Sequence, residues 1–177
     1  RAFAEPARAG AATVRAGEDR FFLGHAGEFS RQLKLDAPAY ASHPMPHLDI
    51  QYTANLEADA DMTGLCQKLT ATLVGLRNDA DEPVFPLTGT RVMAWPAAHY
   101  AVADGAPDRA FIYLLLRIKP GRSDAIKKKA GDALLAAALA HLKPVFAQHA
   151  VGLTLEVDEG AHIYEGKQNN LANYMKG

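Results

Sequence analysis

Hydrophobic and polar residues follow a regular pattern from Pro46 onward. HLDIQY at 47–52 alternates with a period of two, which predicts a β-strand with one buried face. A helix is predicted next, because five hydrophobic residues recur at steps of three and four: Met62, Leu65, Leu69, Leu73 and Leu76. TRVMAW at 90–95 then predicts a second strand.

The second half of this region repeats the order of the first. RAFIYLLLRI at 109–118 is apolar at nearly every position, which is typical of a strand in the middle of a sheet. Ser123 is suited to cap the N-terminus of a helix that follows. We expect four residues to form the apolar face of that helix: Leu135, Leu139, Leu142 and Phe146. AVGLTLEVDE at 150–159 alternates again and predicts a fourth strand.

This order predicts the fold class. Each half reads strand, helix, strand, a βαβ unit whose two strands are parallel. The predicted fold is therefore a two-layer α/β (α+β) domain, with two βαβ repeats forming a four-stranded sheet that carries two helices on one face. The other face would be left open although its strands are rich in hydrophobic residues, so we expect the chain to form an oligomer through it.

Residues 1–45 have a different character. They are rich in Ala, Arg and Gly without a clear period, and the breaker-rich PAYASHP at 38–44 closes the segment. About 45 residues are too few to bury a useful core alone. We predict an N-terminal extension over 1–45, either native or derived from a vector or an upstream start codon, and one folded domain over 46–177.

Composition and charge limit the classes of partner that the protein is expected to bind. The net charge of -1 argues against nucleic acid or an anionic membrane as the main partner. No apolar run approaches the roughly 18 residues needed to span a bilayer, and the N-terminus lacks the pattern of a secretory signal. The single cysteine, Cys66, excludes an intrachain disulfide. We expect a cytoplasmic protein.

Common catalytic and metal motifs are missing from the sequence. It has no glycine-rich nucleotide motif, no GxSxG and no HExxH. His43 and His47 have the spacing of a helical metal pair, but Pro44 and Pro46 prevent a helix there. Cys66 adjoins the apolar face of the first helix and is interpreted as a small buried hydrophobe, not a nucleophile. We predict neither a metal nor an organic cofactor.

Six short motifs occur in order along the domain: MPH at 45–47, ADMTGL at 60–65, FPLTGTR at 85–91, ADG at 103–105, GRS at 121–123 and KQNN at 167–170. Together they resemble the 5-carboxymethyl-2-hydroxymuconate isomerase family of the tautomerase superfamily. The resemblance covers residues 45–177. It implies a trimer with the sheets facing inward, which would cover the open face, and activity on a small dicarboxylate in aromatic catabolism (homoprotocatechuate degradation).

The resemblance also implies a site. In tautomerases the initiator Met is removed, and the secondary amine of the N-terminal proline acts as a general base. Carried onto this chain, it makes Pro46 the base, while Arg91 and Arg122 bind the substrate carboxylates and stabilise charge on the enol oxygen. Arginine suits this role because its planar fork can contact both oxygens of a carboxylate.

One feature departs from the family pattern. Pro46 follows Met45 and 44 further residues here, and an acylated proline nitrogen has no basic lone pair. Activity as an isomerase is thus expected only if Pro46 is the mature N-terminus. Two alternatives stand beside it: an inactive trimeric interaction protein of tautomerase fold with Pro46 blocked, or a hydratase or dehalogenase of the same fold.

Overall fold

A computed structural model describes residues 45–160, 166 and 168–175 of the chain. Its strands are β1 (His47–Thr53), β2 (Arg91–Ala97), β3 (Arg109–Ile118) and β4 (Ala150–Glu159), and its helices are α1 (Met62–Gly75) and α2 (Asp124–Gln148). The described residues also include three short 3-10 helices: η2 (Ala54–Leu56), η3 (Leu87–Gly89) and η4 (Leu171–Asn173). The extension predicted over 1–45 falls almost wholly outside these residues and stays a prediction.

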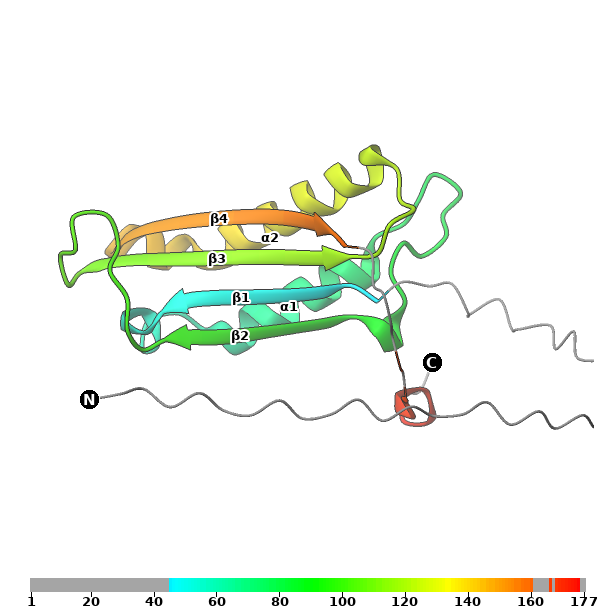
Figure 1. The fold of residues 1–177 in the computed structure, drawn as a ribbon, viewed down its shortest axis with the longest axis horizontal. Coiled ribbons are helices and arrows are strands. Elements are labelled where there is room, and N and C mark those ends of the chain that lie inside the picture. Colours follow the sequence, from blue (N-terminus) through cyan, green and yellow to red (C-terminus); the bar gives the residue numbers. More distant parts are fainter. Residues whose placement is uncertain (1–44, 161–165, 167, 176–177) are drawn as a thin grey trace, which may run out of the picture. The chain divides into compact units, whose positions relative to one another are not determined.

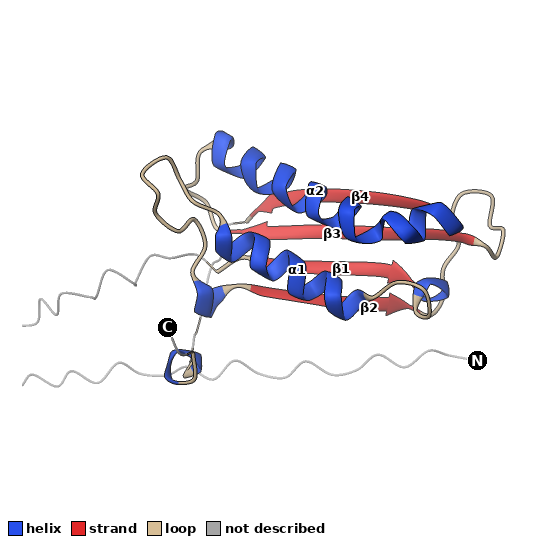
Figure 2. Ribbon diagram, turned by 180° about the vertical axis from the view of Figure 1, so that it is seen from behind, coloured by secondary structure: helices blue, strands red, loops and turns tan. Residues whose placement is uncertain are grey.

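The four strands form one mixed sheet in the order β2-β1-β3-β4. β1 is parallel to β2, β3 is parallel to β4, and the central pair β1 and β3 is antiparallel. Both helices lie on the same face of the sheet (Figures 1 and 2). Within each repeat, the helix returns the chain to the end of the sheet where the first strand began, so the second strand runs parallel to the first. The predicted fold of two βαβ repeats is confirmed.

The core lies between the sheet and the helices. Leu48 and Ile50 of β1 are fully buried against Leu65 and Leu69 of α1, and the helix-facing residues of β3 are buried likewise. The Asp61 side chain caps α1 by accepting a hydrogen bond from the Gly64 amide at 2.8 Å. The alternation and the steps of three and four seen in the sequence therefore report real burial.

The predicted inner face of α2 was wrong in three of four residues. Leu142 is buried, but Leu135, Leu139 and Phe146 are 38%, 44% and 37% exposed. The buried face is formed by five residues: Ala130, Leu134, Ala138, Leu142 and Val145. The small alanine side chains let the helix lie close to the sheet. The buried residues are therefore mostly one position earlier in the sequence than the larger side chains that were predicted to be buried. The predicted Ser123 cap is confirmed, since its hydroxyl accepts from the Ile126 amide at 3.3 Å.

By length and composition alone, α2 passes a test for a membrane-spanning helix, which corrects our expectation that no segment would. Only 28% of its most apolar window is buried. One such helix is weak evidence, because the core helix of a soluble protein passes the same test, and α2 contributes Leu134, Ala138 and Leu142 to the core. The feature therefore does not identify a membrane partner.

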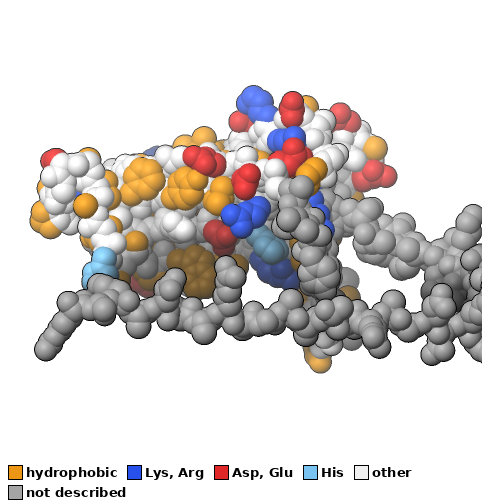
Figure 3. Space-filling model, in the orientation of Figure 1, with side chains coloured by type: hydrophobic (Ala, Val, Ile, Leu, Met, Phe, Trp, Pro, Cys, Tyr) orange, Lys and Arg blue, Asp and Glu red, His pale blue; other side chains and the backbone are white. Residues whose placement is uncertain are grey.

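The open face of the sheet mixes apolar and charged side chains. Phe111, Tyr113 and Leu115 of β3 are half-buried there, and Met93 and Trp95 of β2 are 40% and 55% exposed. Figure 3 shows hydrophobic side chains gathered over β3 and β2, with charged ones nearer the end where β1 begins. The two-sided apolar character predicted for the central strand is present on β3, whereas β4 presents Thr154, Glu156 and Asp158 to this face.

Candidate functional site

The three predicted site residues lie near one end of the sheet. β1 and β2 begin there, at His47 and Arg91, and β3 ends there at Ile118. Pro46 directly precedes β1, and Arg122 lies between β3 and α2. The structure therefore brings to one edge residues that are up to 76 positions apart in the sequence.

Pro46 is buried and is held by the neighbouring strand. Its carbonyl oxygen accepts a hydrogen bond from the Arg91 amide at 3.2 Å. The preceding Met45 lies against Gly89, where an added Cβ would stand only 2.7 Å from the Met45 Cγ. Gly89 thus leaves the space that Met45 occupies, and the nitrogen of Pro46 is in an amide bond with Met45 in this chain.

Arg91 is half-buried, and its side chain contacts His47. The two residues are register partners on β2 and β1, and the Arg91 Nη1 lies 2.9 Å from the His47 Nε2. A guanidinium can only donate, so the Nε2 must accept and the ring is neutral with its proton on Nδ1. This contact leaves the remaining N–H groups of Arg91 as a fork suited to a carboxylate.

Arg122 is half-buried and lies against the loop before β2. Its Nη2 donates to the Val84 carbonyl at 3.1 Å, its Nη1 to the Lys119 carbonyl at 3.4 Å, and its Cζ lies 4.6 Å from the centroid of the Phe85 ring. Burial lowers the pKa of the Arg122 guanidinium, while the negative charge of Glu159 opposes this shift. A partly desolvated cation acts strongly on a bound anion.

The loop of residues 84–91 connects the two arginines. Arg122 holds its first two residues, Thr90 closes it by donating from Oγ1 to the Pro86 carbonyl at 2.9 Å, and Arg91 ends it. The structure thus puts Pro46 and Arg91 in direct contact, whereas Arg122 is joined to them through this loop. The motif FPLTGTR at 85–91 therefore corresponds to a connecting element of the candidate site.

Asn169 of the C-terminal KQNN motif also contacts this loop. Asn169 donates from Nδ2 to the Thr88 carbonyl at 3.2 Å, and its Oδ1 accepts from the Leu171 amide at 2.7 Å. Sequence reasoning noted the motif without a role for it. The contact between His47 and Arg91 was not predicted from the sequence, because a sequence does not give the register between strands. The only signal was the position of His47 directly after Pro46.

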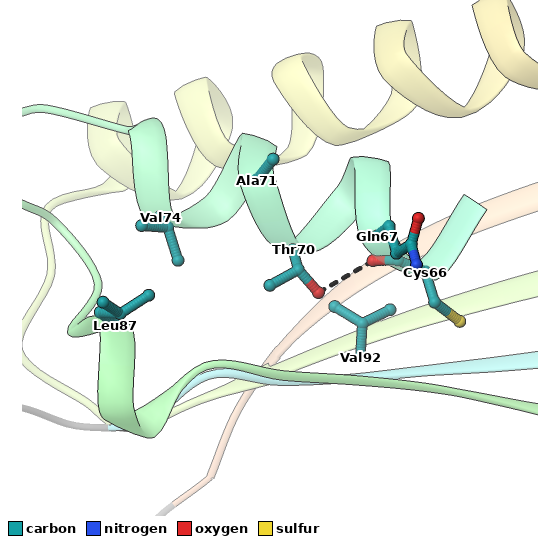
Figure 4. Close-up of a pocket in the computed structure, with 7 residues that line it drawn as sticks. All are labelled: Cys66, Gln67, Thr70, Ala71, Val74, Leu87 and Val92. Atoms are coloured by element: carbon teal, nitrogen blue, oxygen red, sulfur yellow. Dashed lines mark hydrogen bonds between the residues drawn. The ribbon is translucent and has the colours of Figure 1, made fainter. Parts of the chain in front are cut away.

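A separate apolar cleft of about 460 Å³ lies between α1 and the segment from η3 into β2 (Figure 4). Its lining is Cys66, Gln67, Thr70, Ala71, Val74, Leu87 and Val92. None of the three predicted site residues lines it. Cys66 is half-buried, burial raises the pKa of its thiol, and its carbonyl accepts from Thr70 Oγ1 at 2.8 Å. A thiol in this state is a poor nucleophile at neutral pH, as the sequence interpretation expected.

Metal ligands do not cluster in the described part of the chain. Within it, no group of three or more His, Cys, Asp or Glu side chains is placed to hold a metal ion. His43, one member of the pair considered from the sequence, lies outside the described residues. The expectation that no metal or cofactor is needed stays a prediction.

Comparison with known proteins yields consistent matches. The profile of the 5-carboxymethyl-2-hydroxymuconate isomerase family matches residues 46–175. The 5-carboxymethyl-2-hydroxymuconate Delta-isomerase of Escherichia coli is 30% identical over 132 residues, which cover 75% of this chain and all of that protein. A crystal structure of a 5-carboxymethyl-2-hydroxymuconate delta-isomerase is 44% identical with a TM-score of 0.71, covering 75% of this chain and 95% of its own. The isomerase of Deinococcus radiodurans R1 is 38% identical with a TM-score of 0.65, covering 76% and 97%.

Proposed function

The chain belongs to the 5-carboxymethyl-2-hydroxymuconate isomerase family and is an isomerase, and on this premise we propose that it acts on 5-carboxymethyl-2-hydroxymuconate, which carries three carboxylates, or on a similar unsaturated 2-hydroxy dicarboxylate. The observation that carries the proposal is the position of Pro46. The family match begins at this residue, and its carbonyl is hydrogen-bonded to the backbone of Arg91.

The proposed reaction is a proton transfer. The amine of Pro46 takes the proton of the 2-hydroxyl group, the electron pair moves through the conjugated system, and the ammonium returns the proton to a carbon. No atom is gained or lost. Arg91 and Arg122 bind carboxylates and stabilise the negative charge that develops on the enol oxygen. The neutral ring of His47 supports this role, because it accepts from Arg91 and leaves the other donors of the fork to the substrate.

The mechanism requires a free amine, so we propose that the mature N-terminus is Pro46. With Met45 attached, the nitrogen is an amide and cannot act as the base. In that state the alternative of an inactive interaction protein applies. The burial of Pro46 and the packing of Met45 against Gly89 favour this alternative for the uncleaved chain.

Two forms of the protein test the proposal. One starts at Met45, so that methionine removal exposes Pro46, and the other retains residues 1–45. We expect the short form to isomerise 5-carboxymethyl-2-hydroxymuconate in a spectrophotometric assay and the long form to be nearly inactive. Mass spectrometry of each N-terminus is the control, because trimming of the long form would restore activity. Equal activity of two verified forms would exclude Pro46 as the base.

Assembly and setting belong to the same proposal. We propose a homotrimer that covers the apolar residues Phe111, Leu115, Met93 and Trp95 of the open sheet face, acting in the cytoplasm in the catabolism of aromatic compounds. Light scattering should give three times the mass of the chain at micromolar concentration. A monomer would refute the assembly without affecting the chemistry.

A further inference from the structure

A row of charged and titratable side chains crosses the open face next to Pro46. The strand register aligns Arg91 of β2 with His47 of β1, His47 with Arg117 of β3, and Arg117 with Asp158 of β4. Adjacent strands lie about 4.8 Å apart, so the backbones of Arg91 and Arg117 are roughly 10 Å apart with His47 between them. Arg117 is thus a third arginine at the end of the sheet where the candidate site lies.

Arg117 has donors to spare. Its side chain is 52% exposed, and among the described residues its one ion pair joins Nε to the Asp158 Oδ2 at 3.7 Å. That distance is too long for a hydrogen bond, and exposed pairs of this kind contribute little to stability. Within the described part of the chain, the structure therefore gives Arg117 no strong partner.

Arg109 provides the contrast, because it lies on the same strand and the same face at the opposite end. Its side chain is 32% exposed and forms two shorter ion pairs, at 2.8 Å to Asp108 and at 3.1 Å to Asp104. The Asp104 carboxyl has a lowered pKa, first because it accepts from the Ala106 backbone and then because of Arg109. Arg109 thus has a structural role that Arg117 lacks.

The proposed substrate has three carboxylates, whereas only two arginines, Arg91 and Arg122, have so far been given a role in binding them. A muconate is a dienedioate with two carboxylates, and a 5-carboxymethyl substituent adds a third. We propose that Arg117 binds this third carboxylate, which rests on the function proposed above. Arg91 and Arg122 then take the two carboxylates of the muconate chain. The acidic groups near Arg117 on this face of the described sheet are Asp158, Asp49, and Glu156, which accepts from the Tyr113 hydroxyl at 2.6 Å. Asp158 is the one that the ligand displaces.

A pair of substrates isolates this contact. Kinetics of Arg117→Ala are measured with 5-carboxymethyl-2-hydroxymuconate and with 2-hydroxymuconate, which lacks the branch, in the form of the protein that is active. We expect KM for the branched substrate to rise about tenfold or more, the loss of one charge-assisted contact, with kcat less affected. KM for 2-hydroxymuconate should change by less than about twofold in the same variant, because it makes no such contact.

Two further variants complete the test. Arg109→Ala removes the same charge from the same strand and should leave both KM values nearly unchanged, whereas Arg117→Lys should recover part of the loss for the branched substrate. Equal effects of Arg117→Ala on both substrates, or equal effects of the two alanine variants, would overturn the proposal for Arg117 alone. If the unmodified protein turned over neither of the two substrates, the proposed function and this inference would be overturned together.

Discussion

Replacing His47 with phenylalanine removes the acceptor of the Arg91 side chain while keeping an aromatic ring of similar size. The contact is charge-assisted, with 2.9 Å between the Arg91 Nη1 and the His47 Nε2. Hydrogen bonds to charged groups contribute roughly 1.5–3 kcal/mol. Both residues are half-buried, so we expect the lower end, about 1.5 kcal/mol or roughly a tenfold loss of kcat/KM.

A second variant separates the orientation of Arg91 from the bulk of the side chain at position 47. His47→Gln retains an oxygen acceptor at a similar reach and should recover most of the lost kcat/KM. Urea denaturation of each variant checks that the free energy of unfolding is not the cause of any loss.

A double-mutant cycle with Arg91→Ala decides the outcome. If His47 acts by orienting Arg91, His47→Phe should cost nothing further in kcat/KM once Arg91 is gone. Steady-state kinetics on the four proteins of the cycle measure this coupling. Additive losses in the double variant would mean that His47 acts independently of Arg91, and the positioning role would be wrong.

Two further predictions concern stability. Burial, and then the hydrogen bond to Glu57, raise the pKa of Tyr52 to about 12. Because tyrosine in the unfolded chain ionises near pH 10, the free energy of unfolding should fall between about pH 10 and 12. Urea titrations of Tyr52→Phe should show a smaller fall over this pH range. An added Cβ at Gly89 would lie 2.7 Å from Met45 and 3.0 Å from Pro86. Gly89→Ala should therefore lower the melting temperature more in the form that retains Met45 than in the form that begins at Pro46; equal shifts would contradict this.

The strands were predictable from the sequence because their pattern reports burial directly. In β1, Leu48, Ile50 and Tyr52 alternate with polar positions, and each of the three is buried in the structure. The inner face of α2 was not predictable in the same way. Ala130 and Ala138 are buried there, yet alanine carries too little hydrophobic area to stand out beside Leu135 and Leu139.

The candidate site was predictable only as separate motifs. Family motifs pointed to Pro46, Arg91 and Arg122, but their spacing along the chain gave no geometry. The alignment of His47 with Arg91 on one side and Arg117 on the other depends on a parallel and an antiparallel pairing at once. Register of this kind is set by packing across the whole sheet, so local pattern cannot supply it.

The position of β1 gives a physical reason why Pro46 suits the proposed role of a terminal amine. Chain termini usually fray, because few contacts hold them. β1 lies between β2 and β3, so the residue after Pro46 is paired on both sides, and the Pro46 carbonyl accepts from the Arg91 amide at 3.2 Å. A nitrogen at the start of a central strand is therefore fixed relative to Arg91 on β2 and Arg117 on β3. The role of general base proposed for Pro46 would need such fixed geometry, and the sheet is what would supply it.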